Sequence, residues 1–137
     1  MKNVRILFKV LFIIYICMVL FLCLYSFKES DIDLSSYIFG IRADRVAHFV
    51  MFFPYPFSAW LAVKGELRER FGKMSHAIVL TSGVILALAA EALQSLTPAR
   101  DTDPLDLASN IAAIISASII IFALEKTIDN VWPDRLQ

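Results

Sequence analysis

Four long runs without any Asp, Glu, Lys or Arg constrain this chain more than any other feature of its sequence. They cover residues 10–27, 46–63, 74–90 and 107–124, and each is 17 or 18 residues long. A helix needs roughly 20 apolar residues to cross the hydrocarbon core of a bilayer, with about 17 as the lower limit. Helices satisfy their own backbone hydrogen bonds in lipid. The runs therefore predict an all-α integral membrane protein, a bundle of four transmembrane helices.

The flanking residues extend the runs to helices over about 6–27, 45–64, 75–95 and 104–125. Composition agrees, because 58% of the 137 residues are apolar and a soluble domain of this size needs more polar surface. The length suits one domain, so residues 1–137 are expected to form a single transmembrane domain. The first run follows MKNVR, but LYSFKES lacks a small-x-small cleavage site, so we expect a retained helix.

The distribution of Lys and Arg predicts the orientation of the bundle. Nine fall on the side that holds both termini and four on the other side, and the more basic side is the cytoplasmic one. Both termini are therefore expected in the cytoplasm, with KGELRERFGK as the cytoplasmic turn. In the second helix, Pro54 and Pro56 remove two backbone donors and predict a kink near mid-membrane. A packing kink is the simpler interpretation, ahead of a functional hinge.

Polar residues gather near the outer ends of three predicted helices. Glu91 lies sixteen residues after Ser75, or about 24 Å at 1.5 Å per residue, in a core that is roughly 30 Å thick. His48 lies one turn below Asp44, where the second helix starts, and Asn110 lies one turn below Asp106 in a helix that starts near Asp103. The predicted outer layer consists of Asp44, Arg45, His48, Glu91, Gln94, Arg100, Asp106 and Asn110.

Small residues form a stripe on each of the last two predicted helices, and each stripe runs into polar groups at its outer end. The stripes are Gly83, Ala87 and Glu91 on one helix, and Asp106, Asn110, Ala113 and Ala117 on the other. Small residues at this spacing let membrane helices approach closely. A carboxylate facing lipid is costly, so Glu91 should face the bundle. We expect tight packing deep in the membrane and a polar pocket near the outside.

Simpler roles exist for several of these side chains. An Asp followed by Pro is typical of a helix start, so capping is the preferred role of Asp103, and Asp44 could likewise cap the second helix. The guanidiniums of Arg45 and Arg100 could sit among lipid phosphates. Capping does not explain polar groups within helices, such as Asn110, and we interpret the layer as a functional site.

Three segments carry a resemblance to a known family. DRVAHF at 44–49, EALQSLTPAR at 91–100 and DPLDLASNIAA at 103–113 together resemble the VanZ-like family of bacterial membrane proteins. That family has Asp-Lys/Arg-x-x-His-Phe at one helix start, Glu-x-x-Gln before a Pro/Gly-Arg loop, and Asp-x-x-x-Asn opening the last helix. The segments cover about half of the chain, and Ala112–Ala113 depart from the family, which often has Gly there.

The resemblance implies a small multi-pass protein of the bacterial cytoplasmic (inner) membrane with about four helices. The founding member is associated with low-level resistance to teicoplanin, a lipid-anchored glycopeptide that binds cell-wall precursors. The first hypothesis is therefore a non-catalytic protein that binds an envelope lipid headgroup, a lipid-linked cell-wall precursor or a lipoglycopeptide. Its expected ligand-binding residues are Arg45, Arg100, Gln94 and Asn110, with arginine suited to phosphate or carboxylate.

The second hypothesis is a membrane-embedded enzyme that modifies an envelope lipid. His48 would act as general base, oriented by Asp44 one turn earlier on the same face. Glu91 or Asp106 would be a second acid or base. The sequence leaves open whether the chain is an enzyme, and the candidate catalytic residues are His48, Asp44, Glu91 and Asp106.

Other ligand classes are disfavoured by the sequence. A metal site built from Asp44, His48, Glu91 and Asp106 would suit Mg²⁺ or Mn²⁺ better than zinc, but the two nearby arginines count against it. Neither a metal nor a cofactor is therefore expected. Basic patches interleaved with aromatic residues are lacking, so nucleic acid is not an expected partner. The remaining alternative is that the layer is a buried salt-bridge network that fixes the order of the helices.

Overall fold

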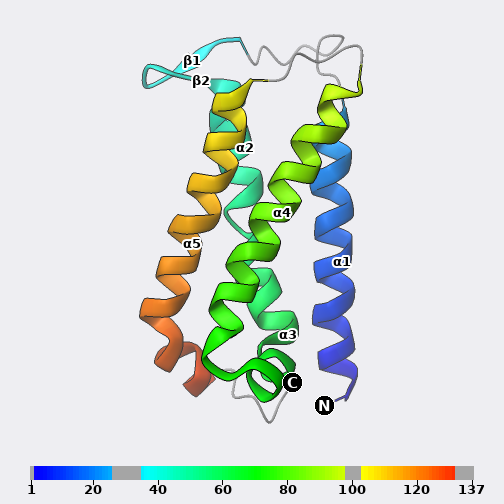
Figure 1. Cartoon of the computed structure of the whole chain (residues 1–137), viewed down its shortest axis with the longest axis vertical. Helices are drawn as coiled ribbons and strands as arrows, with labels where there is room; N and C mark the ends of the chain where they lie inside the picture. Colours follow the sequence, from blue (N-terminus) through cyan, green and yellow to red (C-terminus); the bar gives the residue numbers. More distant parts are fainter. Residues whose placement is uncertain (1, 26–34, 98–102, 132–137) are drawn as a thin grey trace.

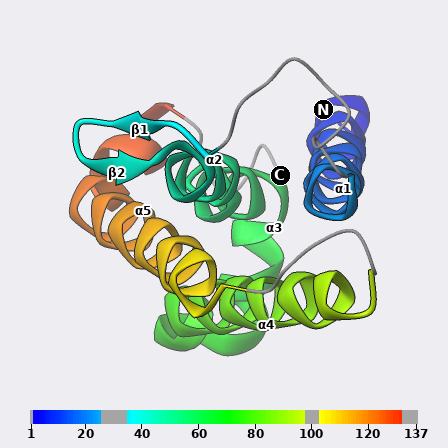
Figure 2. The same ribbon diagram turned by 90° about the horizontal axis from the view of Figure 1, so that it is seen from above.

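The computed structural model describes residues 2–25, 35–97 and 103–131, which form a helical bundle with one small hairpin (Figure 1). The long helices are α1 (Lys2–Leu24), α2 (Ala43–Phe52), α3 (Tyr55–Phe71), α4 (Ser75–Ser95) and α5 (Pro104–Val131). The 3₁₀ helix η2 (Gly72–Met74) joins α3 to α4, and strands β1 (Tyr37–Ile38) and β2 (Ile41–Arg42) pair before α2. Seen from above, α5 lies beside α2 and α4, and α1 stands on the other side of the bundle (Figure 2).

Three helical stretches among the described residues are long and apolar enough to cross a membrane: Asn3–Leu24, Ala43–Ser95 and Pro104–Val131. The middle stretch, 53 residues long, is bent, because the chain runs through α2 and α3 and turns back at η2 into α4 (Figure 1). Large apolar side chains such as Phe21, Ile85 and Phe122 are exposed on the outside of the bundle. An apolar exterior around such helices indicates a multi-pass membrane protein.

The predicted second helix is interrupted at the prolines, where the kink was expected. Helix α2 ends at Phe52, and α3 begins at Tyr55 after a turn through Phe53 and Pro54. Pro56 occupies the first turn of α3, where a missing N–H leaves no helical hydrogen bond unmade. The two prolines therefore separate two helices that stack end to end in Figure 1.

The predicted boundaries need two corrections at the end opposite the hairpin. Most of KGELRERFGK is helical, because α3 continues to Phe71, and the turn is confined to η2, where Gly72 has a φ of +54°. Helix α5 continues to Val131, beyond the predicted end at 125. A prediction from uncharged runs stops at the first charge, whereas these helices continue into turns whose charged side chains pair with one another.

The small stripes of α4 and α5 face the interior of the bundle. Ala87, Ala113 and Ala117 are fully buried. A β-carbon added at Gly83 would lie 2.9 Å from the ring of Tyr55 and 3.0 Å from Cγ2 of Ile114. Close packing of α3, α4 and α5 at this level therefore depends on glycine.

The hairpin was not predicted from the sequence. Its two central residues, Phe39 and Gly40, have φ values of 50° and 81°, which close a two-residue turn between the strands. A backbone hydrogen bond of 2.8 Å from Ala43 to the carbonyl of Ser36 joins the base of the hairpin to the start of α2. The hairpin lies at the end of the bundle where α2 and α5 begin and α4 ends (Figure 1).

Candidate functional site

Two helix starts bring polar side chains together near the hairpin. The first turns of α2 and α5 lie beside each other, and the last turns of α4 are at the same end (Figures 1 and 2). The outer cluster consists of Arg42 at the end of β2, Asp44, Arg45 and His48 on α2, Asp103 just before α5, and Asp106 and Asn110 on α5. Predicted residues from separate spans thus lie in one place.

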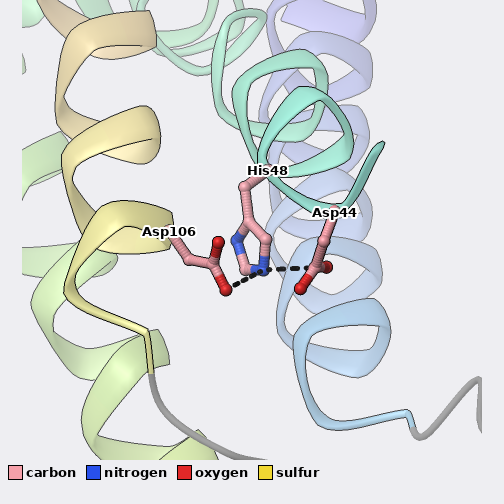
Figure 3. Close-up of side chains that lie close together, drawn as sticks. All are labelled: Asp44, His48 and Asp106. Carbon is pink, nitrogen blue, oxygen red and sulfur yellow. Dashed lines mark ion pairs between the residues drawn. The ribbon is translucent and has the colours of Figure 1, made fainter. Parts of the chain in front are cut away.

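The centre of the outer cluster is the imidazole of His48, which lies between two carboxylates (Figure 3). His48 Nε2 is 3.8 Å from Oδ1 of Asp44 and 3.9 Å from Oδ2 of Asp106. Asp44 and His48 share one face of α2 because they are four residues apart. His48 and Asp106 are 2% and 4% exposed, so their interaction is shielded from solvent.

The other ring nitrogen of His48 contacts Asn110, which lies one turn after Asp106 on α5. His48 Nδ1 and the side-chain oxygen of Asn110 are 3.1 Å apart, and Asn110 is fully buried. An amide oxygen accepts hydrogen bonds, so in this orientation Nδ1 carries the ring proton. Nε2 of a neutral His48 then presents its lone pair to the two carboxylates.

Asp103 holds two arginines at the edge of the outer cluster. Its Oδ2 is 3.3 Å from Nη1 of Arg42 and 3.1 Å from Nη2 of Arg45. Its Oδ1 accepts a 2.9 Å hydrogen bond from the backbone N–H of Leu105, so the predicted capping role of Asp103 is confirmed. The Leu105 N–H, and then the Arg45 guanidinium, hold the pKa of Asp103 below its ordinary value.

The capping role considered for Asp44 is wrong. Helix α2 begins at Ala43 with Arg42 at the cap position, and no side chain caps it. Asp44 instead lies in the first turn, where a negative charge favours the helix dipole. Its carboxylate faces Nε2 of His48, an arrangement that a helix start does not require.

The remaining predicted site residues, Gln94, Glu91 and Arg100, are not members of the outer cluster. Gln94 is buried between α4 and α1, where its amide donates a 2.9 Å hydrogen bond to the carbonyl of Cys23. Glu91 is half-buried on α4 and near enough to Asp106 for their charges to interact. Arg100 lies outside the described residues. The prediction of a single layer therefore holds for α2 and α5, whereas Gln94 joins α4 to α1.

Several polar atoms of the outer cluster are buried without a hydrogen-bond partner among the described residues. They are Nε of Arg45, Oδ1 of Asp106 and Nδ2 of Asn110. Buried polar groups are nearly always satisfied, so each of these atoms calls for an explanation. All three belong to side chains that pair with other members of the outer cluster through their remaining atoms.

A second polar network, which was not predicted from the sequence, lies at the opposite end of the bundle. Lys64 is completely buried and its Nζ lies 2.8 Å from Oδ1 of Asp129, which also accepts a 2.8 Å hydrogen bond from Arg68. Glu125 pairs with Arg68 and lies 3.1 Å from Nε2 of His76. Spacing of four residues within each pair, Lys64 with Arg68 and Glu125 with Asp129, was the available sequence signal.

Chemically, the outer cluster can hold a proton or a cation between His48 and two carboxylates. Acid–base chemistry at Nε2 and recognition of an anion by Arg45 are both compatible with its residues. Comparison with known proteins gives no match for this chain among family models, curated proteins or solved structures.

Proposed function

We propose that this chain is a VanZ-like protein of the bacterial cytoplasmic membrane that crosses the bilayer four times. The bent middle stretch supplies two of these passes, one through α2 and α3 and one through α4. The excess of Lys and Arg at the η2 end supports a cytoplasmic location for that end, with the hairpin and the outer cluster outside.

The proposed function is binding of an anionic envelope ligand by the outer cluster, either a lipid headgroup or a lipid-linked cell-wall precursor. The observation that carries it is the pair of guanidiniums, Arg42 and Arg45, that converge on one oxygen of Asp103 at the membrane edge. Arginine donates to phosphate or carboxylate in a bidentate manner. The buried Nε of Arg45 has no acceptor among the described residues, so an oxygen of a bound ligand would satisfy it.

The association of the VanZ-like family with teicoplanin fits this class of ligand. Teicoplanin carries a lipid anchor and binds cell-wall precursors, so a protein that binds either one at the outer leaflet would change the drug's access to its target. Expression of this chain in a susceptible host should then raise teicoplanin resistance, and Arg45→Gln should abolish the increase.

Native mass spectrometry of the purified full-length protein tests the proposed ligand. We expect a phosphate-bearing lipid or precursor to stay bound to the wild type and to be lost from Arg45→Gln and Arg100→Ala. Arg70→Gln is the matched control, because Arg70 is exposed near the opposite end of the bundle. Equal retention in all four proteins would overturn the proposal.

Labelling of single cysteines tests the proposed orientation. In a chain with Cys17 and Cys23 replaced by Ala, Phe39→Cys should react with a membrane-impermeant maleimide in intact cells. Lys73→Cys in η2 should react after permeabilisation of the membrane. Reaction of both positions from the same side would contradict the proposed crossings.

A second candidate function is a membrane-embedded enzyme that modifies an envelope lipid. The placement of His48 beside Asp44 favours it, because a carboxylate 3.8 Å from Nε2 can orient an imidazole that acts as a general base. Expression of the wild type should alter the envelope lipid profile, and His48→Ala should restore it. Identical lipid profiles with and without the protein would eliminate this function.

A further inference from the structure

We propose that Asp44, His48 and Asp106 form a binding site for a divalent cation of the Mn²⁺ or Mg²⁺ class. One potential ligand atom from each side chain lies within 4.8 Å of the other two, and Figure 3 shows the two carboxylates on either side of the imidazole. Ligands about 2.1 Å from such a cation lie roughly 3 Å apart when adjacent and roughly 4 Å apart when opposite. The separations of 3.8 and 3.9 Å from Nε2 lie near the upper end of this range, so a bound cation would draw the three side chains closer together.

The surroundings of Asp106 support a cation. His48 is the sole ionisable partner within ion-pair distance of Asp106 in the part of the chain that the structure describes, and a neutral imidazole does not compensate the carboxylate charge. Arg42 and Arg45 pair with Asp103, and Arg42 also lies 3.9 Å from Oδ2 of Asp44, but neither is within ion-pair distance of Asp106 among the described residues. A buried carboxylate needs a compensating charge or hydrogen bonds, and Oδ1 of Asp106 has no hydrogen-bond partner among the described residues.

Asn110 supplies the supporting contact that histidine ligands of metals usually have. A ligating histidine donates its second ring N–H to an oxygen, which fixes the ring and directs the other nitrogen at the metal. The 3.1 Å contact from Nδ1 of His48 to the side-chain oxygen of Asn110 has this geometry. Asp106 and Asn110 are four residues apart on α5, so one helix face provides both a ligand and its support.

The ligand types favour Mn²⁺ or Mg²⁺. Two carboxylates with one imidazole form an oxygen-rich set, whereas tetrahedral zinc sites contain more nitrogen or sulfur ligands. Three protein ligands leave further coordination positions for water or for an oxygen of a bound phosphate. The last role rests on the proposed function, because it assigns the cation to the same anionic ligand that Arg45 would contact.

A competing arrangement satisfies the same side chains without a cation. If the Asn110 amide is reversed, Nδ2 donates to Nδ1 of His48, and Nε2–H faces the two carboxylates. This arrangement predicts a closed hydrogen-bond network with no affinity for metal. Cation binding therefore distinguishes a ligand site from a network that only fixes helix order.

Electron paramagnetic resonance of Mn²⁺ tests the site directly. The full-length protein, purified in a phosphate-free maltoside detergent and stripped with a chelator, is titrated with Mn²⁺ alone. We expect one bound Mn²⁺ per chain, with a nitrogen coupling that changes when histidine is labelled with ¹⁵N. His76→Gln should keep that coupling, since His76 lies near the opposite end. Absence of stoichiometric binding, or of any histidine coupling, would overturn the proposal.

Variants then assign the ligands. Asp106→Asn and His48→Gln should abolish binding, and Asn110→Ala should weaken it by roughly 10–100-fold, as expected for a group that orients a ligand. Glu66→Gln is the matched control, because this carboxylate is exposed and pairs with Lys9. Unchanged binding in His48→Gln would overturn the assignment, and competition by Mg²⁺ or Zn²⁺ identifies the preferred cation.

A final experiment distinguishes the proposed cation site from the proposed lipid binding. Phosphatidylglycerol added to the Mn²⁺-loaded protein should introduce a ³¹P coupling at the metal. If Mn²⁺ binds but no ³¹P coupling develops, the cation site is supported and its role in phosphate binding is contradicted. If the lipid binds the chelator-treated protein and Mn²⁺ does not bind, the proposed function stands and the cation site falls.

Discussion

The side chains of His48 and Asn110 join α2 to α5 through a contact of 3.1 Å between two almost completely buried groups. Asn110→Ala removes the oxygen and leaves Nδ1 of His48 without a partner. An unsatisfied buried donor costs about 1–3 kcal/mol, so we expect a lower thermal midpoint in detergent. Ser109→Ala is the control, since its hydroxyl bonds to the Leu105 carbonyl of its own helix at 3.0 Å. Equal midpoints for the two variants would contradict this role of Asn110.

Gly83 tests the packing of the three helices below the outer cluster. Gly83→Val places a β-carbon 2.9 Å from the ring of Tyr55, and the branched side chain then forces α4 away from α3 and α5. Overpacking of this kind costs about 1–3 kcal/mol, and thermal unfolding measures it. Ala89→Val, on the exposed face of α4, should leave the midpoint unchanged. A Gly83→Val protein as stable as Ala89→Val would show that these helices separate easily.

The centre of the outer cluster could be predicted because two simple regularities determine it. Spacing of four residues places Asp44 above His48 and Asp106 above Asn110 on their helices. The position of each residue relative to the uncharged runs sets its depth: the acid of each pair lies in the first turn of its helix, and the second residue lies one turn deeper. Residues at equal depth on neighbouring helices then meet when their faces are turned toward each other.

The rest could not be predicted, because it depends on which helices are neighbours. Gln94 has the same depth as the outer cluster, but its face of α4 is directed at α1 and the Cys23 carbonyl. The hairpin escaped detection because Phe39 takes a positive φ that Asn or Gly adopts more readily. Charges such as Asp129 were read as the end of a span, although they continue α5 and pair with α3.

Lys64 and Asp129 test the network at the opposite end. Asp129→Asn leaves the ammonium of Lys64, which is 0% exposed, without the carboxylate that now lies 2.8 Å from it. We expect destabilisation of about 1–3 kcal/mol in thermal unfolding, as for other buried groups that lose a partner. Glu69→Gln is the control, because Glu69 is exposed on the same end of α3. Similar midpoints for both variants would show that Asp129 does not stabilise the buried lysine.

Replacement of both Lys64 and Asp129 tests whether the charges of this ion pair are needed for stability. Apolar residues of similar volume often replace a buried ion pair without loss of stability. The double variant Lys64→Met, Asp129→Leu should therefore have a thermal unfolding midpoint closer to that of the wild type than the Asp129→Asn variant has. Failure to recover would indicate that Arg68, which also pairs with Asp129, needs this carboxylate.

The stability contributed by Asp103 should depend on pH with a definite sign. The Leu105 N–H and the Arg45 guanidinium hold its pKa below the ordinary 3.8, so folding favours the ionised form. The contribution is present above the ordinary pKa and disappears as the pH falls through the lowered value. Asp103→Asn should therefore unfold at a lower temperature than the wild type near neutral pH, and the difference should shrink toward zero as the pH falls through the lowered pKa of Asp103. Measurement of both proteins at each pH cancels the carboxylates that they share, and Glu66→Gln, an exposed carboxylate, provides the baseline. A difference that grows on acidification would mean that Asp103 is protonated in the folded protein and does not hold Arg45 as an anion.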